Sequence, residues 1–425
     1  MNIVFLYRII HALFALVTLY FITQYLTLEE QGWYYTFLSF SALVYLFDFG
    51  LSMALIHVSA IEFVKLKWGF KGLIIGENQK RFKDFLSMAF DKYAKIGLLY
   101  FLIILPFGFF YFNQNETAKN YYWYLPWIMH VVFSTLSLLC FPFTSIVEGS
   151  GNITEIYRLK IVQILAGSIL CCFLIYFSYP LYAPSMFLLS TVIITLLWLL
   201  FYRKNNFPEK INIYSSYNWK DNVSSFKNKV GITFLSSYLF VQIYTPVLFY
   251  FEDPMTAGKF GLSLAIGNML GLISSSWFVT NIPGMTKAIA ENNHTKFVIL
   301  FKKSFYQSTF FLIFSIIFIS SIYLIFLEEE IFNRILNFYN FIGILLIILI
   351  THLINSIVIY IRCFKREPLA VPHFICSIIT LIIGFYVLLD YSVSGLIITI
   401  LAIQFFITIP VTLLGWKKHR QKLEI

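Results

Sequence analysis

Long apolar runs recur from one end of this chain to the other, and they constrain its fold more than any other feature. Most of them reach the roughly 20 residues that a helix needs to cross about 30 Å of hydrocarbon. Only 12% of the residues are charged, against about 25% in a typical soluble domain. We therefore predict an all-α polytopic membrane protein without a soluble catalytic domain.

Charged residues, glycines and prolines interrupt the apolar sequence and divide it into about twelve candidate transmembrane helices. The predicted boundaries carry errors of about 2 to 4 residues. The predicted limits are 3–25, 33–59, 96–113, 122–147, 155–178, 182–202, 230–251, 257–281, 304–327, 336–361, 369–389 and 393–416. The first run lacks a small-residue cleavage site and is long for a signal peptide, so we expect a membrane helix there.

The distribution of charge predicts the orientation of these spans. Lys and Arg concentrate in cytoplasmic loops. With both termini placed in the cytoplasm, 28 of the 31 basic residues fall on that side, whereas the outer loops are short and mostly acidic. The +10 net charge is thus explained by topology, and we expect no nucleic-acid partner.

The basic stretch that precedes the third span is amphipathic. Phe82, Phe85, Ala89 and Tyr93 share one helical face, with charged residues opposite. Two interpretations fit this pattern equally well. The segment either lies in the membrane interface or simply extends the third span inward.

Matching features in the two halves indicate an internal repeat. Gly32 opens the second span after an acidic outer loop, "TLEEQGWYYTFLSF", and Gly258 opens the eighth in the same setting, "FEDPMTAGKFGLSL". Short, charged turns follow the fourth and tenth spans. We predict an N-terminal six-helix lobe over 1–205, a cytoplasmic linker over 206–229 and a C-terminal six-helix lobe over 230–425, in the same orientation. Such parallel repeats suit a transporter with its site between the lobes.

These stretches, together with "LVYLFDFGLSMALI" and "NIPGMTKAIA", resemble the polysaccharide-transporter family of O-antigen and capsule flippases. That family lies in the MOP superfamily, which also contains the MATE exporters. The resemblance covers nearly the whole chain and implies two lobes around a central cavity. It further implies transport of undecaprenyl-pyrophosphate-linked oligosaccharides across the bacterial inner membrane by alternating access coupled to a cation gradient. Implied partners are the lipid-linked oligosaccharide, the bilayer, and the glycan polymerase and chain-length machinery.

An anionic pyrophosphate and hydroxyl-rich sugars need a polar path with cations, and the first two spans offer candidates. Arg8 and His11 lie roughly 8 and 12 Å from the start of the first span, on a stripe of small and polar residues. Asp48 interrupts the second span at a similar depth. We expect Asp48 to pair with His11 or Arg8. Asp48 and His11 then become candidates for ion coupling, although a purely structural pair fits equally well, and Arg8 is as easily explained by snorkelling to headgroups.

Other polar residues are weaker candidates for binding the substrate. Gln242 and Asn268 are placed to meet sugar hydroxyls, and Arg158, Lys160 and Arg362 at two cytoplasmic turns are placed to attract pyrophosphate. Positive-inside topology explains these basic residues at least as well. Small residues at 263, 267, 271 and 274 form a helix-packing stripe.

Two other classes of membrane protein remain as alternatives. A MATE-like drug exporter shares the predicted architecture. However, the predicted spans contain one buried acid, Asp48, and more basic residues, Arg8 and several His, and this balance of charge suits an anionic substrate better than a cationic drug. A glycan polymerase or ligase is disfavoured by the short outer loops, so we do not expect an enzyme. We expect no metal or cofactor beyond a coupling ion, either H⁺ or Na⁺.

Overall fold

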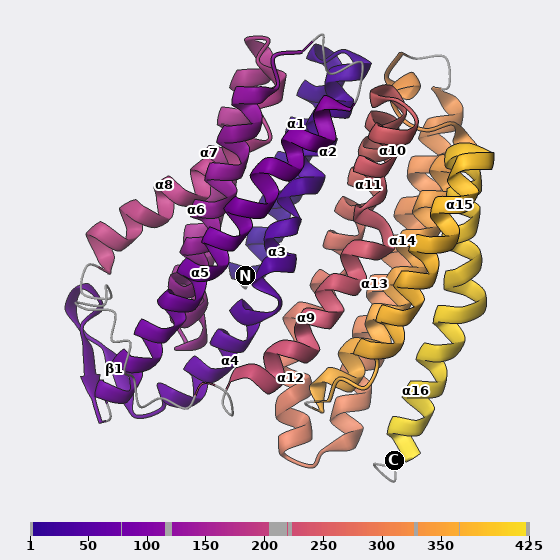
Figure 1. The fold of residues 1–425 in the computed structure, drawn as a ribbon. Helices are drawn as coiled ribbons and strands as arrows, with labels where there is room; N and C mark the ends of the chain where they lie inside the picture. The colour runs from indigo at the N-terminus through magenta and orange to yellow at the C-terminus, as the bar shows by residue number, and fades with distance from the viewer. Residues whose placement is uncertain are drawn as a thin grey trace. The chain divides into compact units, whose positions relative to one another are not determined.

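The structure is a computed structural model that describes residues 3–77, 79–114, 121–203, 219, 223–326, 330–364 and 366–421. It is nearly all helical, as predicted (Figure 1). The chain forms two compact units. Unit 1 comprises Met1–Leu19, Thr27–Thr36 and Leu235–Ile425, and unit 2 comprises Tyr20–Leu26 and Phe37–Phe234.

The first half of the chain contains the helices α1 (Ile3–Tyr25), α2 (Leu28–Ser41), α3 (Leu43–Asp48), α4 (Leu51–Glu62), α5 (Gln79–Asn113), α6 (Tyr124–Gly149), α7 (Ile153–Tyr176) and α8 (Ser185–Tyr202). Between α4 and α5 lie two short antiparallel strands, β1 (Leu66–Trp68) and β2 (Ile74–Gly76), joined through a 3₁₀ turn, η1 (Phe70–Gly72). The sequence pattern predicted only a basic loop here. A second 3₁₀ turn, η3 (Pro180–Tyr182), precedes α8.

The second half contains α9 (Ser225–Ser237), α10 (Tyr244–Phe251), α11 (Pro254–Ser274), α12 (Ser276–Ala290), α13 (His294–Ile325), α14 (Phe338–Cys363), α15 (Ala370–Ile403) and α16 (Ile409–Gln421). Two π-helical turns, η6 (Tyr238–Gln242) and η8 (Gln404–Thr408), and one 3₁₀ turn, η7 (Glu330–Arg334), complete it. Pro246 lacks the N–H that would bond the carbonyl of Gln242, the residue at which the π-helical turn η6 ends.

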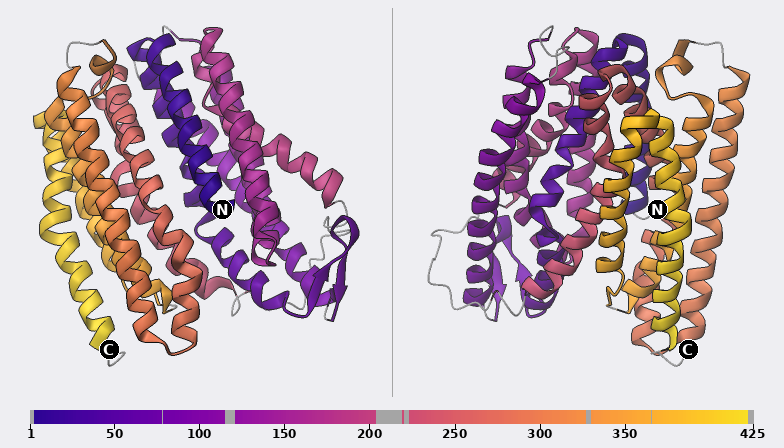
Figure 2. Two further views of the ribbon diagram at one scale, coloured as in Figure 1. Left: turned by 180° about the vertical axis from the view of Figure 1, so that it is seen from behind. Right: turned by 45° about the vertical axis from the view of Figure 1, so that its right-hand side comes forward.

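Ten helices of the described residues are long and apolar enough to span a membrane, and the bent α2–α4 segment makes eleven. The last of them is not straight. Ser392 has non-helical backbone angles, and the Nε2 of His373 lies 2.8 Å from the Oγ1 of Thr412. Residues 39 positions apart in one straight helix would be about 58 Å apart. The chain therefore reverses near Ser392, between the limits that the sequence predicts for the last two spans, and Figures 1 and 2 show α15 turning back toward α16.

The amphipathic stretch before the third span is part of a single 35-residue helix, α5. Its apolar face packs inside unit 2, because Phe82 is 1% exposed and Phe85, Ala89 and Tyr93 are fully buried. Of the two interpretations of this stretch, extension of the third span is therefore confirmed, and the interfacial helix is wrong.

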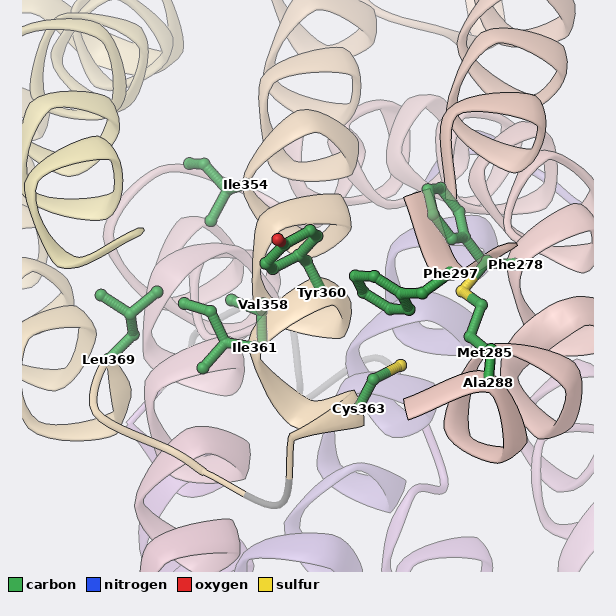
Figure 3. Packing of buried hydrophobic residues seen from close by; sticks show 10 residues of the cluster. All are labelled: Phe278, Met285, Ala288, Phe297, Ile354, Val358, Tyr360, Ile361, Cys363 and Leu369. Carbon is green, nitrogen blue, oxygen red and sulfur yellow. The ribbon is translucent and has the colours of Figure 1, made fainter. Parts of the chain in front are cut away.

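Unit 1 has an aromatic and aliphatic core where α12, α13 and α14 meet (Figure 3). The ring of Phe297 on α13 packs edge-on against Tyr360 on α14, with centroids 5.0 Å apart. Phe278 and Met285 contribute from α12, and both are at least 99% buried. Edge-to-face aromatic pairs stabilise a core beyond the area that they bury.

The outer segment of the second span belongs to unit 1 because it crosses α11 at very short range. A Cβ added to Gly258 would lie 2.8 Å from the backbone N of Gly32, so glycine is needed where the backbones meet. The side-chain amide of Gln31 donates to the carbonyls of Gly258 and Arg334, both at 2.9 Å. This grouping differs from the predicted lobe limits, which placed residues 1–205 together. The predicted linker over 206–229 lies largely outside the described residues.

Candidate functional site

The second and eighth spans are both broken at the same position relative to their matching glycines. Asp48 lies 16 residues after Gly32, and Ser274 lies 16 residues after Gly258. The helix ends at both residues, with α3 ending at Asp48 and α11 at Ser274, and a new helix starts within three residues. The first break bends the span by 47°, whereas α11 and α12 continue as one span, Pro254–Ile289, with the right-handed Ser275 between them. Helix ends inside a membrane leave backbone groups that polar side chains must satisfy.

The break in unit 2 has a left-handed backbone. Phe49 has φ 46° and Gly50 has φ 74°, and a bulky residue rarely adopts the former. A Cβ on Gly50 would lie 2.7 Å from the backbone N of Gly231, so α9 packs directly against the break. Such strain persists only where the surrounding structure holds it, and it often accompanies function.

Asp48 is fully buried at this break. Its carboxylate accepts hydrogen bonds from the Tyr93 hydroxyl at 2.5 Å and from the Ser52 hydroxyl at 2.8 Å. The backbone N–H of Ser52, at the N-terminus of α4, also donates at 3.1 Å. Three donors and a helix N-terminus supply the compensation that a buried carboxylate needs. Nearby, the Lys227 ammonium lies 5.8 Å from the centre of the Phe49 ring.

The break in unit 1 holds a cation instead. The Arg8 guanidinium donates to the Ser275 hydroxyl at 2.6 Å and to the Leu272 carbonyl at 3.1 Å. Both groups lie where α11 meets α12, and the Leu272 carbonyl also accepts a hydrogen bond from the Ser275 hydroxyl at 2.9 Å. Arg8 is therefore held by groups of a second helix. A side chain that only snorkels to the headgroups would not need such contacts.

His11 lies almost one turn after Arg8 and is partly buried, with its ring 5.9 Å from that of Tyr7. Its Nδ1 is buried and has no hydrogen-bond partner among the described residues. The hydrogen bonds of Asp48 given above all come from unit 2, and those of Arg8 come from unit 1. The pairing of Asp48 with His11 or Arg8 stays a prediction.

The remaining predicted residues are dispersed. Gln242 is partly buried in the π turn η6, and Asn268 is exposed on α11. Arg158 is exposed on α7. Lys160 bonds Glu148 at 2.9 Å, and Arg362 bonds Glu367 at 2.5 Å. The last two cations are thus already paired with acids.

Two buried histidines and the predicted glycine stripe have structural partners. The Nε2 of His130 lies 3.1 Å from the Ser41 hydroxyl, and the Nε2 of His352 lies 3.1 Å from that of Ser308. Both histidines are satisfied core residues. On α11, Gly267 and Gly271 face Ile348 of α14, so this stripe packs helices, as predicted.

Sequence reasoning missed Tyr93 and Ser275. Tyr93 was recognised only as part of the apolar face of α5, and nothing in its neighbourhood signals a carboxylate 45 positions earlier. The i,i+4 spacing of Asp48 and Ser52 is one at which side chains meet, and the structure shows that contact.

No family model matches this chain, and no curated protein matches its sequence. Its fold, however, is similar to solved transporter structures. The lipid II flippase MurJ in an inward closed conformation aligns with 98% of this chain and 86% of its own, at a TM-score of 0.65 and 14% identity. An inward-facing multidrug resistance MATE transporter of the MOP superfamily aligns with 97% of this chain and 98% of its own, at 0.61 and 12%.

A third similar structure is a MOP superfamily transporter from Pyrococcus furiosus, whose binding pocket is described as reversed in polarity. It aligns with 99% of this chain and 95% of its own, at a TM-score of 0.57 and 13% identity. At such low identity the likeness establishes the fold alone. The chain therefore has the fold shared by the MurJ flippase and the MATE transporters of the MOP superfamily.

Proposed function

We propose that this protein is a flippase for lipid-linked oligosaccharides. It would move undecaprenyl-pyrophosphate-linked repeat units of a surface polysaccharide, such as O-antigen or capsule, across the bacterial inner membrane by alternating access. Both termini would be cytoplasmic, as the distribution of basic residues indicates. The fold and the polar breaks in two membrane spans support this proposal.

The observation that carries the proposal is the Arg8 guanidinium at the break in α11. A cation within a membrane span costs a few kcal/mol at least, and such residues usually serve a polar path or cavity. Arginine also suits phosphate, because its planar guanidinium offers several N–H donors at once. In the proposed flippase Arg8 and His11 bind the pyrophosphate, while Gln242 and Asn268 meet sugar hydroxyls.

The basic residues at the cytoplasmic turns would attract the substrate without binding it specifically. Arg158, Lys160 and Arg362 would raise the local concentration of the anionic substrate. The acids bonded to Lys160 and Arg362 reduce the field of those two residues, so Arg158 would contribute most.

Asp48 is the proposed coupling residue. It is a fully buried carboxylate at a strained backbone break, so gain or loss of a proton, or of a Na⁺ ion, would change the balance of hydrogen bonds that holds the break. In this proposal the bend between α3 and α4 changes as the ion is exchanged. Transport by Asp48→Asn at normal protein levels would exclude the coupling role.

A MATE-like drug exporter is the second candidate, and the buried carboxylate of Asp48 favours it. Exporters of cationic drugs benefit from carboxylates in their cavities. The two candidates differ in what accumulates when the protein is lost.

Depletion of the protein in its native cell separates the two. The flippase proposal expects the lipid-linked oligosaccharide to accumulate on the cytoplasmic leaflet, where a membrane-impermeant glycosidase cleaves it in inside-out vesicles. An unchanged glycan surface with altered drug sensitivity would favour the exporter instead.

A further inference from the structure

The β1–β2 hairpin has one face buried in unit 2 and one face exposed. Leu66 and Ile74 point inward and are 5% and 6% exposed. Cross-strand pairing places Lys67 opposite Ile75 on the other face, where both are exposed. Buried and exposed side chains therefore alternate along both strands, although each strand has only three residues.

Trp68 fixes the orientation of the hairpin. Its indole N–H donates to the Ser150 hydroxyl at 2.6 Å, and its ring stacks on Phe63 with centroids 4.7 Å apart. The Arg203 guanidinium lies over the ring of Trp68, 4.6 Å from its centroid. With three different contacts on its inner side, the hairpin presents a defined outer face.

The hairpin tip, residues 70–73, exposes two large apolar side chains on either side of Lys71. Phe70 is 81% exposed and Leu73 49%. Lys71 has a left-handed backbone with φ 50°, and its ammonium lies 5.4 Å from the centre of the Phe70 ring. Side chains of this size gain about 1.5 to 3 kcal/mol each when they leave water, so two of them exposed together at the tip indicate a binding surface.

The hairpin tip lies at the end of a membrane span. The turn η1 contacts α8, and Arg203, which holds Trp68, directly follows the last residue of α8. Phe201 and Tyr202 at that end are each 68% exposed. Aromatic residues at span ends mark the membrane–water interface. The exposed apolar surface of α8 thus continues onto the hairpin tip.

The charge of this region suits an anionic surface. Residues 62–83 contain six basic and two acidic residues. The two acids are already paired, Glu77 with Lys65 at 2.9 Å and Glu62 with Arg81 at 2.6 Å. A net charge of about +4 beside exposed apolar side chains matches the headgroup layer of an anionic leaflet, where each nearby Lys contributes about 1 kcal/mol.

We propose that the hairpin tip inserts into the headgroup region of the leaflet at the Tyr202 end of α8, and that anionic phospholipid strengthens this insertion. The hairpin would then act as an interfacial anchor between the second and third spans. This inference is independent of the transported substrate.

A spin label on the full-length protein in vesicles tests the proposal. All five native cysteines are buried, so a single added cysteine can be labelled selectively. Phe70→Cys places the label at the hairpin tip, and Glu77→Cys places a matched control at the other end of the same hairpin. Relaxation by oxygen, which concentrates in the bilayer, is compared with relaxation by a water-soluble nickel complex.

In phosphatidylcholine vesicles that contain phosphatidylglycerol, we expect oxygen to relax the label at position 70 more than nickel does, and the reverse at position 77. Removal of phosphatidylglycerol should shift position 70 toward the nickel-accessible regime, and Lys67→Gln with Lys71→Gln should do the same. Equal nickel access at 70 and 77 would overturn the proposal. Insertion that ignores lipid charge would overturn the role of anionic headgroups.

Discussion

Replacement of Tyr93 by Phe removes one hydroxyl from the most enclosed charged group that the structure describes. The Tyr93 hydroxyl donates to Asp48 at 2.5 Å, and both residues are fully buried. A hydrogen bond to a charged group contributes about 1.5 to 3 kcal/mol. At roughly 2 °C per kcal/mol for a large domain, the Tm should fall by about 3 to 6 °C.

Tyr100→Phe is a matched control. Tyr100 lies seven residues further along α5 and is also fully buried. Its hydroxyl approaches that of Ser134 but forms no hydrogen bond of standard geometry among the described residues. Loss of this hydroxyl should leave the Tm unchanged or raise it slightly, because an unsatisfied buried hydroxyl is itself unfavourable.

Thermal unfolding of the purified protein can be followed with a thiol-reactive fluorophore, since the five buried cysteines react only once the chain opens. A double-mutant cycle with Asp48→Asn then isolates the coupling between Tyr93 and Asp48. We expect a coupling of about 1.5 kcal/mol or more. Equal Tm values for Tyr93→Phe and Tyr100→Phe, or a coupling near zero, would refute this description of the Asp48 site.

Two further experiments use the same unfolding assay, one on the packing of unit 1 and one on an ion pair of unit 2. Gly258→Ala places a methyl group 2.8 Å from the backbone of Gly32 and should cost about 1 to 3 kcal/mol, whereas Gly271→Ala meets only a side chain at 3.4 Å and should be tolerated. An equal effect of the two alanines would contradict the close crossing of α2 and α11. Glu155→Gln leaves the 5%-exposed Arg203 without its charged partner. With Glu155 itself 32% exposed, we expect a loss of about 1 to 3 kcal/mol, and an unchanged Tm would show that this ion pair contributes nothing.

The spans were predictable because each depends on a local property, an apolar run of sufficient length. Even the reversal between the last two spans, near Ser392, follows from a small polar interruption that the sequence displays. The hairpin was not predictable, because three-residue strands carry almost no periodic signal, and its inner face depends on Trp68 meeting Arg203, far along the chain.

The candidate site was likewise predictable only in part. Sequence gives the depth of a residue along its helix, so Arg8 and Asp48 were recognised as unusual. It does not give the direction in which each helix face points toward its neighbours. The partner of Arg8 lies 267 positions away, and no local pattern could identify it.

The most direct test of the account is transport by the purified protein in vesicles. A fluorescent undecaprenyl-pyrophosphate-linked oligosaccharide becomes protected from a membrane-impermeant quencher when it is flipped. Arg8→Gln should slow protection roughly tenfold or more, as expected for the loss of about 1.4 kcal/mol or more. Arg420→Gln, which removes one exposed cation from the end of α16, should leave the rate unchanged. Wild-type rates for Arg8→Gln would contradict the claim that a cation at the α11 break carries the anionic lipid across the membrane.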